Sequence, residues 1–223
     1  MLEADRSVGT GDQFCDRVAQ IVSDCIERCP PDARQRAIEI GCGSGWLCEL
    51  LAKSFVEVYG TDLSRAAIEV ARRKVPNGRF VSGDFLQVPL PEPADLVVSC
   101  EVVAHVRDQR AFLERCREVT RTGGRFLLLS QNPIVWRRTI YLEQHENRLR
   151  HWPTLGEFRR HFAAVGFELV SFDTFLPMGE KGLLRPRPYA QGLLRRIVGR
   201  PRAVRLFERI RLGRTMVLET IAV

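Results

Sequence analysis

Three glycines alternate with other residues directly after a short apolar segment of the chain. The segment 37–40 reads Ala-Ile-Glu-Ile, and Gly41, Gly43 and Gly45 follow it before a helical stretch begins. Glycine suits such a turn because the backbone must bend tightly and approach a ligand closely, which a Cβ atom would obstruct. A strand, a glycine turn and a helix together form the phosphate- or nucleoside-binding unit of doubly wound sheets.

The spacing of these glycines separates one nucleotide cofactor from another. It is G-x-G-x-G rather than the G-x-G-x-x-G of dinucleotide-binding folds. Trp46 stands where those folds place a third glycine for close contact between helix and strand. This departure argues against NAD and predicts a different nucleoside at the turn.

Acidic side chains and one histidine follow the later strands of the predicted sheet. Asp62 ends the second strand, Asp84 follows the third, and Glu101 and His105 follow the fourth. Ligands of open parallel sheets bind outside the carboxyl ends of the strands. These positions therefore predict a ligand-binding edge.

Hydrophobic periodicity supplies the elements that must position these residues. Strands are predicted over 37–41, 57–62, 79–82, 95–100, 125–130, 167–175 and 216–223, and helices over 11–29, 46–54, 64–74, 109–121 and 154–165. The helix over 109–121 is expected to be closed by Gly123 and Gly124. Nearly continuous apolar strands between helices indicate an α/β, doubly wound, mostly parallel sheet covered on both faces, with an antiparallel last strand.

Length and composition indicate one globular domain over 1–223. The chain has 45% hydrophobic and 27% charged residues, and this is an ordinary soluble composition. No apolar run approaches the ~20 residues that cross a bilayer, and the N-terminus has no secretory pattern. Seven cysteines without a C-x-x-C pair predict reduced, buried thiols in a cytoplasmic protein.

Two insertions interrupt the alternation, at about 131–153 and 177–215, and are expected to form a substrate or lid region. Between 176 and 215 there are eleven Lys and Arg residues against two acids, in a chain of net charge +7. The basic stretch 181–214 predicts amphipathic helices that either pack as a lid, bind an anionic membrane surface or dock an acidic carrier protein. Nucleic acid is the least favoured partner because this stretch lacks the interleaved aromatic residues that RNA readers use.

Five motifs resemble, in order and distance, those of class I S-adenosylmethionine-dependent methyltransferases. They are Glu39-Ile-Gly-Cys-Gly-Ser-Gly45, Gly60-Thr-Asp-Leu-Ser64, Gly83-Asp-Phe85, Asp95-Leu-Val-Val-Ser-Cys-Glu-Val-Val-Ala-His105 and Thr122-Gly-Gly-Arg-Phe-Leu-Leu. The likeness covers roughly 14–130 and the last two strands. It implies a seven-stranded sheet with an antiparallel last strand, and S-adenosyl-L-methionine as the cofactor.

The resemblance also implies roles for individual residues. The glycine turn would lie against the amino acid part of the cofactor, Asp62 would accept hydrogen bonds from the ribose hydroxyls, Leu63 and Phe85 would enclose the adenine, and Asp84 would accept from its amine. The cofactor-binding set is Glu39, Gly41, Cys42, Gly43, Gly45, Asp62, Leu63, Asp84, Phe85 and Cys100. Three alternatives stay open: the glycines as a plain tight turn, Asp62 as a helix N-cap, and Phe85 as a core residue.

Methyl transfer from a sulfonium depends mainly on alignment and desolvation, and a hydroxyl or protonated amine acceptor also needs a base. His105 is the first candidate for that base. Glu101 lies four residues earlier and would share its face if a helix begins there. The alternative is a structural histidine beside the cofactor.

The segment from Glu101 to His105 is similar to the Glu-x-x-Glu-His pattern of ubiquinone-type O-methyltransferases, where these groups are associated with a divalent metal. Ala104 replaces the second acid here, so no metal site is predicted. Phe14, Tyr141, His145 and Trp152 are candidate substrate contacts, or else ordinary surface aromatics and histidines.

The predicted function is methyl transfer from S-adenosyl-L-methionine to a small organic acceptor, at oxygen rather than nitrogen, on a biosynthetic or lipid-linked intermediate. The alternatives are a membrane-surface lipid or quinone methyltransferase, peripheral to the membrane, and a non-catalytic module that binds the cofactor.

Overall fold

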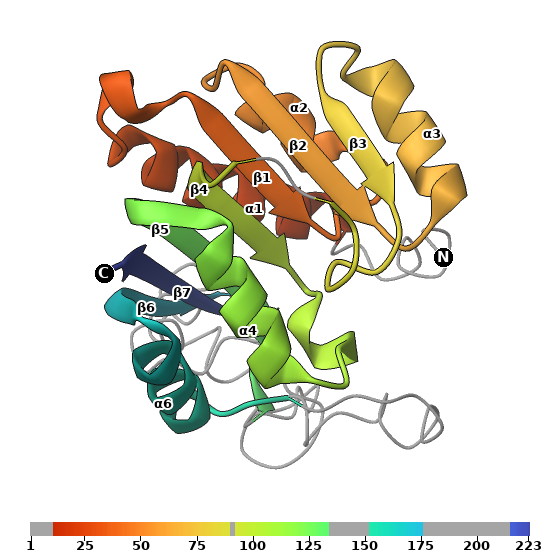
Figure 1. Ribbon diagram of the computed structural model, residues 1–223. Coiled ribbons are helices and arrows are strands. Elements are labelled where there is room, and N and C mark those ends of the chain that lie inside the picture. The colour runs from red at the N-terminus through yellow and green to blue at the C-terminus, as the bar shows by residue number, and fades with distance from the viewer. Residues whose placement is uncertain (1–10, 90–91, 134–151, 176–214) are drawn as a thin grey trace, which may run out of the picture. The chain divides into compact units, whose positions relative to one another are not determined.

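The computed structural model describes residues 11–89, 92–133, 152–175 and 215–223 (Figure 1). The elements along the chain are α1 (Gly11–Glu27), η2 (Pro31–Ala33), β1 (Arg36–Ile40), α2 (Trp46–Leu51), β2 (Glu57–Asp62), α3 (Arg65–Lys74), β3 (Arg79–Ser82), β4 (Ala94–Cys100), η3 (Val103–His105), α4 (Gln109–Glu118), β5 (Thr120–Gln131), α6 (Leu155–Val165), β6 (Phe167–Phe175) and β7 (Thr215–Ala222). Both predicted insertions, apart from a few residues at their ends, lie outside the described residues, as does the basic stretch 181–214.

The strands form one seven-stranded sheet in the order β3-β2-β1-β4-β5-β7-β6. Strand β1 pairs in parallel with β2, and β2 pairs in parallel with β3. Strand β7 runs antiparallel to β6. The predicted fold class, a mostly parallel α/β sheet with an antiparallel last strand, is confirmed.

Among the described residues, the chain forms two compact units. The first contains residues up to Val98 together with 118–127, and the second contains 99–117 and the residues from 128 onward. In the first unit, α2 packs on β1 and β2, while α3 packs on β2 and β3. Apolar side chains of these elements, including Ile38 and Leu47, are fully buried, so burial of both strands and helices stabilises this unit.

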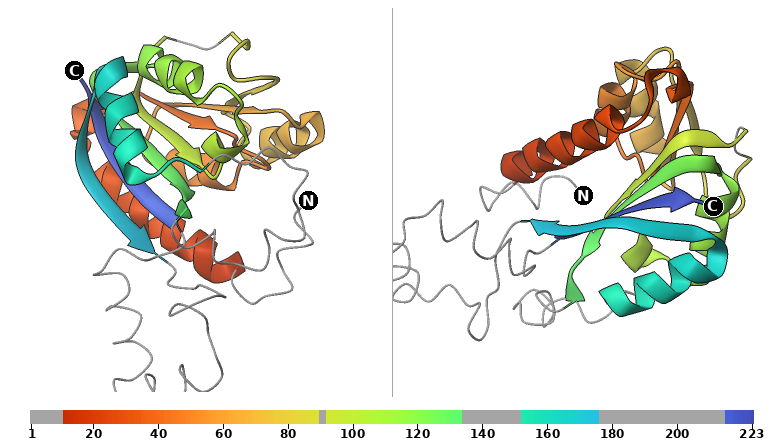
Figure 2. Two further views of the ribbon diagram at one scale, coloured as in Figure 1. Left: turned by 90° about the horizontal axis from the view of Figure 1, so that it is seen from below. Right: turned by 90° about the vertical axis from the view of Figure 1, so that its left-hand side faces the viewer.

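In the second unit, α6 packs along β6, and Figure 2 shows the helix beside the β6–β7 pair. The rings of Phe158 and Phe162 stack with centroids 5.7 Å apart, and Phe167 meets Phe162 edge-on at 6.1 Å. Thr154 and Glu157 form a complete capping box at the start of α6. Aromatic packing and capping together explain why the predicted helix and strand both form here.

The prediction that a helix runs to residue 121 and is closed by two glycines is wrong. Helix α4 ends at Glu118, and β5 already begins at Thr120. An added Cβ at Gly124 would lie 3.0 Å from the carbonyl oxygen of Ala94 in β4. The same Cβ would lie 2.8 Å from the carbonyl oxygen of Arg121, so glycine is required there by close backbone contacts within β5 and with β4 rather than by a helix end.

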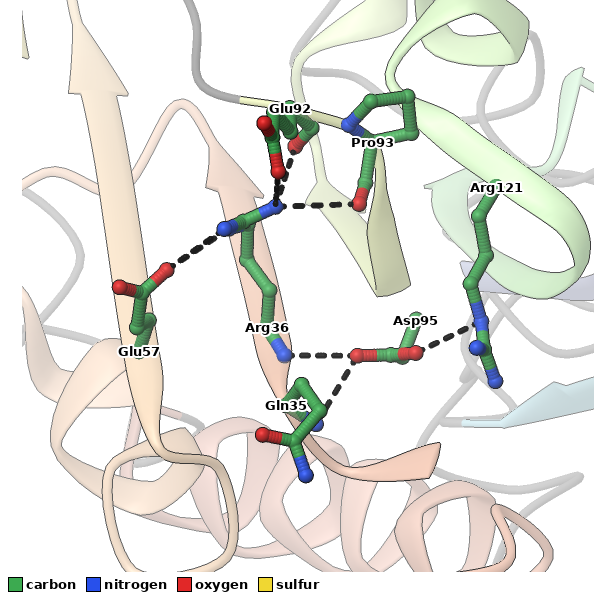
Figure 3. Close-up of polar contacts among 7 residues, drawn as sticks. All are labelled: Gln35, Arg36, Glu57, Glu92, Pro93, Asp95 and Arg121. Carbon is green, nitrogen blue, oxygen red and sulfur yellow. Dashed lines mark hydrogen bonds and ion pairs between the residues drawn. The ribbon is translucent and has the colours of Figure 1, made fainter. Parts of the chain in front are cut away.

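A polar network at the amino ends of the strands fixes β1 against β2 and β4 in the first unit (Figure 3). The buried carboxylate of Asp95 accepts hydrogen bonds from the amides of Gln35 at 3.0 Å and Arg36 at 2.7 Å, and from Arg121 Nε at 2.7 Å. Arg36 donates to Glu57, its register partner on β2, at 2.9 Å. Each buried charge is thus paired and hydrogen-bonded, as a low-dielectric site requires.

Candidate functional site

The predicted glycine turn joins β1 to α2 and uses left-handed backbone at all three glycines. The φ angles are 74° at Gly41, 51° at Gly43 and 78° at Gly45. A Cβ at Gly45 would lie 2.8 Å from the Cβ of Ala71 in α3, whereas a Cβ at Gly43 would meet nothing within 4 Å. The third glycine therefore allows the turn to pack on α3, and Gly43 lies beside open space that a ligand could occupy.

Asp62, at the end of β2, ties this turn to the next one. Its Oδ2 accepts from the amide of Gly43 at 2.9 Å, and its Oδ1 accepts from the amide of Ser64 at 2.8 Å. The N-cap of α3 is Ser64, whose hydroxyl accepts from Ala67 N at 3.2 Å. The alternative that Asp62 caps this helix is therefore wrong, and a carboxylate with two donors keeps lone pairs for further donors.

Glu39 lies on the strand that leads into the glycine turn and is 2% exposed. The thiol of Cys48, in α2, donates a hydrogen bond to Glu39 Oε2 at 2.9 Å. Burial is the main cause that raises the pKa of Glu39 to about 8, and the negative charge of Asp62 adds to it. Sequence reasoning did not find the role of Cys48, because its contact with Glu39 exists only after α2 has folded back on β1.

The residues predicted to enclose the adenine differ in exposure. Leu63 is 80% exposed next to the Asp62 carboxylate, whereas Phe85 is 7% exposed and belongs to the core. This burial supports the alternative that Phe85 is a core residue. Asp84 is exposed and accepts a hydrogen bond from the amide of Leu86 at 3.0 Å, and its contact with the cofactor remains a prediction.

In the second unit, the chain turns sharply after β4. Cys100 is half-buried, and Glu101 has a φ of 59° and donates its amide to the carbonyl of Leu129 at 2.9 Å. A left-handed backbone at a residue other than glycine is strained, at a cost of about 1–3 kcal/mol, and such positions cluster at functional sites. Glu101 thus remains a functional candidate on independent, structural grounds.

No α-helix begins at Glu101, so the predicted shared helical face with His105 is wrong. Val103–His105 form one 3-10 turn, in which Ala104 is buried and the side chain of His105 is exposed. A 3-10 turn is tighter than an α-helix and does not align residues four apart. An exposed imidazole is accessible to an acceptor, but its catalytic role remains a prediction.

The predicted substrate contacts are found in different settings. Phe14 is half-buried in α1, and Trp152 is 5% exposed just before α6. Tyr141 and His145 lie outside the described residues.

Sequence reasoning assigned no role to three polar side chains at the ends of β4 and β5. The buried side-chain oxygens of Ser99, Ser130 and Gln131 have no hydrogen-bond partner among the described residues. Polar residues at the ends of otherwise apolar strands were the only signal in the sequence. Buried oxygens of this kind are normally satisfied by water or a ligand.

Two features are absent from the described part of the chain. No group of three or more His, Cys, Asp or Glu side chains within it is arranged to hold a metal ion. Its helices are too short or too polar for any of them to span a membrane.

Comparison with known proteins agrees with this geometry. Residues 38–128 match the family model described as a methyltransferase domain. A probable S-adenosylmethionine-dependent methyltransferase of Mycolicibacterium smegmatis is 33% identical over 47% of this chain and 41% of its own length. A ubiquinone biosynthesis O-methyltransferase of Sinorhizobium medicae is 32% identical over 62% of this chain and 58% of its own length.

This chain thus spans about half the length of the curated relatives that it matches. The solved structure of an S-adenosylmethionine-dependent methyltransferase from Mesorhizobium loti superposes with a TM-score of 0.64 at 19% identity, covering 89% of this chain and 96% of that one. That likeness shows the fold. Residues 38–128 are therefore similar to the methyltransferase domain that the family model describes, and the chain shares the fold of a solved S-adenosylmethionine-dependent methyltransferase.

Proposed function

We propose that this protein transfers a methyl group from S-adenosyl-L-methionine to an oxygen atom of a small organic acceptor. The observation that carries the proposal is the bond between Asp62 Oδ2 and the amide of Gly43, 2.9 Å long. This bond holds a carboxylate that can accept further hydrogen bonds beside the open space at the glycine turn. The family match of this region supports the same reading.

The residues around the turn fit this cofactor chemically. Asp62 retains acceptor capacity for the ribose hydroxyls, and the neighbouring Leu63, 80% exposed, offers an apolar surface for a purine ring. The open space beside Gly43 leaves room for the amino acid part. A dinucleotide fits the turn less well, because Trp46 replaces the third glycine of the dinucleotide motif.

The bound cofactor supplies an activated methyl group on a sulfonium. The work left to the protein is to hold the two reactants in line and to exclude water. We assign removal of the acceptor's proton to His105, which is exposed after β4. Glu101, held in a strained turn by its bond to Leu129, is assigned to positioning of the acceptor.

The preference for an oxygen acceptor rests on two facts. Several relatives are named ubiquinone biosynthesis O-methyltransferases, and the segment after β4 reads Glu-Val-Val-Ala-His, similar to their pattern. A small biosynthetic or lipid-linked intermediate suits this class. The basic stretch 181–214 would then bring the enzyme to an anionic membrane surface or to an acidic carrier protein.

The direct test incubates the protein and cell extract with S-adenosyl-L-methionine that carries a labelled methyl group. We expect a labelled small molecule that does not form with the Asp62→Ala variant. Identifying this molecule names the methyl acceptor. If the protein binds the cofactor but labels no compound, the proposal of catalysis fails and a binding module replaces it. Label in nucleic acid or protein alone would contradict the small-molecule assignment.

A further inference from the structure

The pair formed by Glu39 and Cys48 is the least expected polar contact next to the glycine turn. Glu39 is 2% exposed and Cys48 is fully buried. The distance from Cys48 Sγ to Glu39 Oε2 is 2.9 Å. The pair lies within the first unit, on the strand and the helix that the turn joins.

The surroundings of Glu39 are poor for a negative charge. The hydrogen bonds to Glu39 come from Cys48, through its thiol, which is a weak donor, and its backbone amide. They offset only part of the lost hydration of a carboxylate, because burial still dominates. Cys48 is itself hydrogen-bonded to Cys42 of the glycine turn, and its thiol keeps its proton because this hydrogen bond and burial raise its pKa well above the usual range. The remaining titratable group that acts on Glu39, Asp62 at the end of β2, is also acidic.

Among the described residues, the groups that act on Glu39 are the thiol and the backbone amide of Cys48 and the carboxylate of Asp62, and none of them carries a positive charge. A buried carboxyl in such a place stays protonated unless a positive charge arrives. The predicted ligand of the adjoining turn carries such a charge as a sulfonium. Its demethylated product is a neutral thioether with the same adenosine and amino acid parts.

We propose that Glu39 determines cofactor specificity: its carboxyl group releases a proton to solvent when the sulfonium nucleoside binds, and the carboxylate formed favours that ligand over the thioether product. The inference rests on the proposed function, because it needs this nucleoside at the glycine turn. In this proposal Glu39 distinguishes the sulfonium ligand from the thioether product by charge rather than by shape. Product release would follow from the same step, since loss of the methyl group removes the sulfonium charge, which is the charge by which the two ligands differ.

The size of the effect follows from reciprocity. The factor by which the sulfonium raises the acidity of Glu39 equals the factor by which ionised Glu39 tightens sulfonium binding. A decrease of one unit in the pKa corresponds to about tenfold. Burial raises the pKa of Glu39 in the free protein to about 8, so the preference for the sulfonium ligand increases with pH across the neutral range.

The test measures the dissociation constants of S-adenosyl-L-methionine and S-adenosyl-L-homocysteine for the wild-type protein and for Glu39→Gln, from about pH 6 to about pH 9. Glutamine keeps an acceptor for the Cys48 thiol but cannot ionise. The ratio of the two dissociation constants, measured in Glu39→Gln at each pH, corrects for titration of the amino groups of the two ligands. Glu49→Gln, at an exposed position of α2, is the matched control.

We expect the ratio of the two constants to change about tenfold or more in favour of the sulfonium ligand as the pH rises, in wild type and Glu49→Gln, and to change less in Glu39→Gln. Calorimetry in two buffers of different ionisation enthalpy should show proton release with the sulfonium ligand only. Identical pH profiles in the wild type and in Glu39→Gln would overturn the inference while the proposed function stands. Binding of neither nucleoside would overturn the proposed function, and the inference with it.

A second measurement uses the wild-type protein, so it tests the inference even if the Glu39→Gln variant does not fold. Infrared difference spectra of the wild-type protein should show the loss of a protonated carboxyl band on addition of the sulfonium ligand, and no loss with the thioether. Cys48→Ser replaces the thiol by a stronger donor, so it should move the change to lower pH. Equal spectra with both ligands would contradict the inference.

Discussion

The carboxylate of Asp62 accepts a hydrogen bond from the amide of Gly43, and this 2.9 Å contact joins the end of β2 to the turn after β1. A second bond, from Ser64 N at 2.8 Å, fixes the other oxygen. The carboxylate is therefore oriented before any ligand arrives, which lowers the entropic cost of binding. Several expectations depend on this arrangement.

Replacement of Asp62 by alanine should weaken binding of S-adenosyl-L-methionine by about 100-fold, because charged hydrogen bonds contribute about 1.5–3 kcal/mol each. Asp62→Asn should weaken binding less, since the amide keeps one acceptor oxygen. Isothermal titration calorimetry measures both, with Glu114→Gln, an exposed ion-pair residue of α4, as the control. Unchanged affinity in Asp62→Ala would remove this residue from the cofactor site.

Two glycines of the turn should differ in their tolerance of alanine. Both have left-handed backbone, which costs about 1–2 kcal/mol for alanine. A Cβ at Gly45 would also lie 2.8 Å from Ala71, while Gly43 faces open space. We expect Gly45→Ala to be the less stable variant in urea unfolding and Gly43→Ala to lose cofactor affinity instead. Equal unfolding midpoints for the two would contradict the packing argument.

The stability of the ligand-free protein should depend on pH through Glu39. Burial raises the pKa of this carboxyl from 4.5 to about 8 in the folded protein. Between these values the unfolded chain has lost the proton and the folded protein still binds it, so the free energy of unfolding falls as pH rises. Below the lower value and above the higher one this group adds no further pH dependence.

Urea unfolding of the wild type and Glu39→Gln at several pH values checks this. The variant should lack the decline that Glu39 causes between about pH 5 and about pH 8. A wild type whose stability, relative to the variant, stays constant over this interval would show that Glu39 is ionised in the folded protein.

At the opposite ends of the strands, the buried Asp95 should matter for stability and not for the cofactor. Asp95→Ala leaves the amides of Gln35 and Arg36 without their acceptor, and we expect a loss of about 2–4 kcal/mol. Arg121→Ala should cost about 1 kcal/mol or less, because that side chain is 45% exposed. Denaturant midpoints measure both. A larger loss in Arg121→Ala than in Asp95→Ala would contradict the assignment of Asp95 as the centre of the network.

His105→Ala should lower turnover much more than it lowers affinity for the cofactor, since a general base contributes typically about 100-fold or more to the rate. Rates with the identified acceptor and calorimetric affinities separate the two effects. Activity equal to wild type in this variant would exclude His105 from the mechanism.

The order of the elements and the glycine turn could be predicted from the sequence, because buried parallel strands are short apolar runs and the turn needs glycine. The sequence predicts that α4 runs to residue 121, because Gly123 and Gly124 resemble a helix end. In the structure Gly124 instead allows β4 and β5 to approach closely. The Glu39–Cys48 bond and the strained backbone at Glu101 depend on tertiary packing. No local pattern in the sequence reports either of them.

The central claim is that the glycine turn and Asp62 hold a sulfonium nucleoside. A crystal structure of the protein with S-adenosyl-L-methionine tests it most directly. We predict the ribose hydroxyls on the Asp62 carboxylate and the amino acid part beside Gly43. An empty turn at saturating ligand, or a nicotinamide nucleotide bound there in its place, would contradict the account.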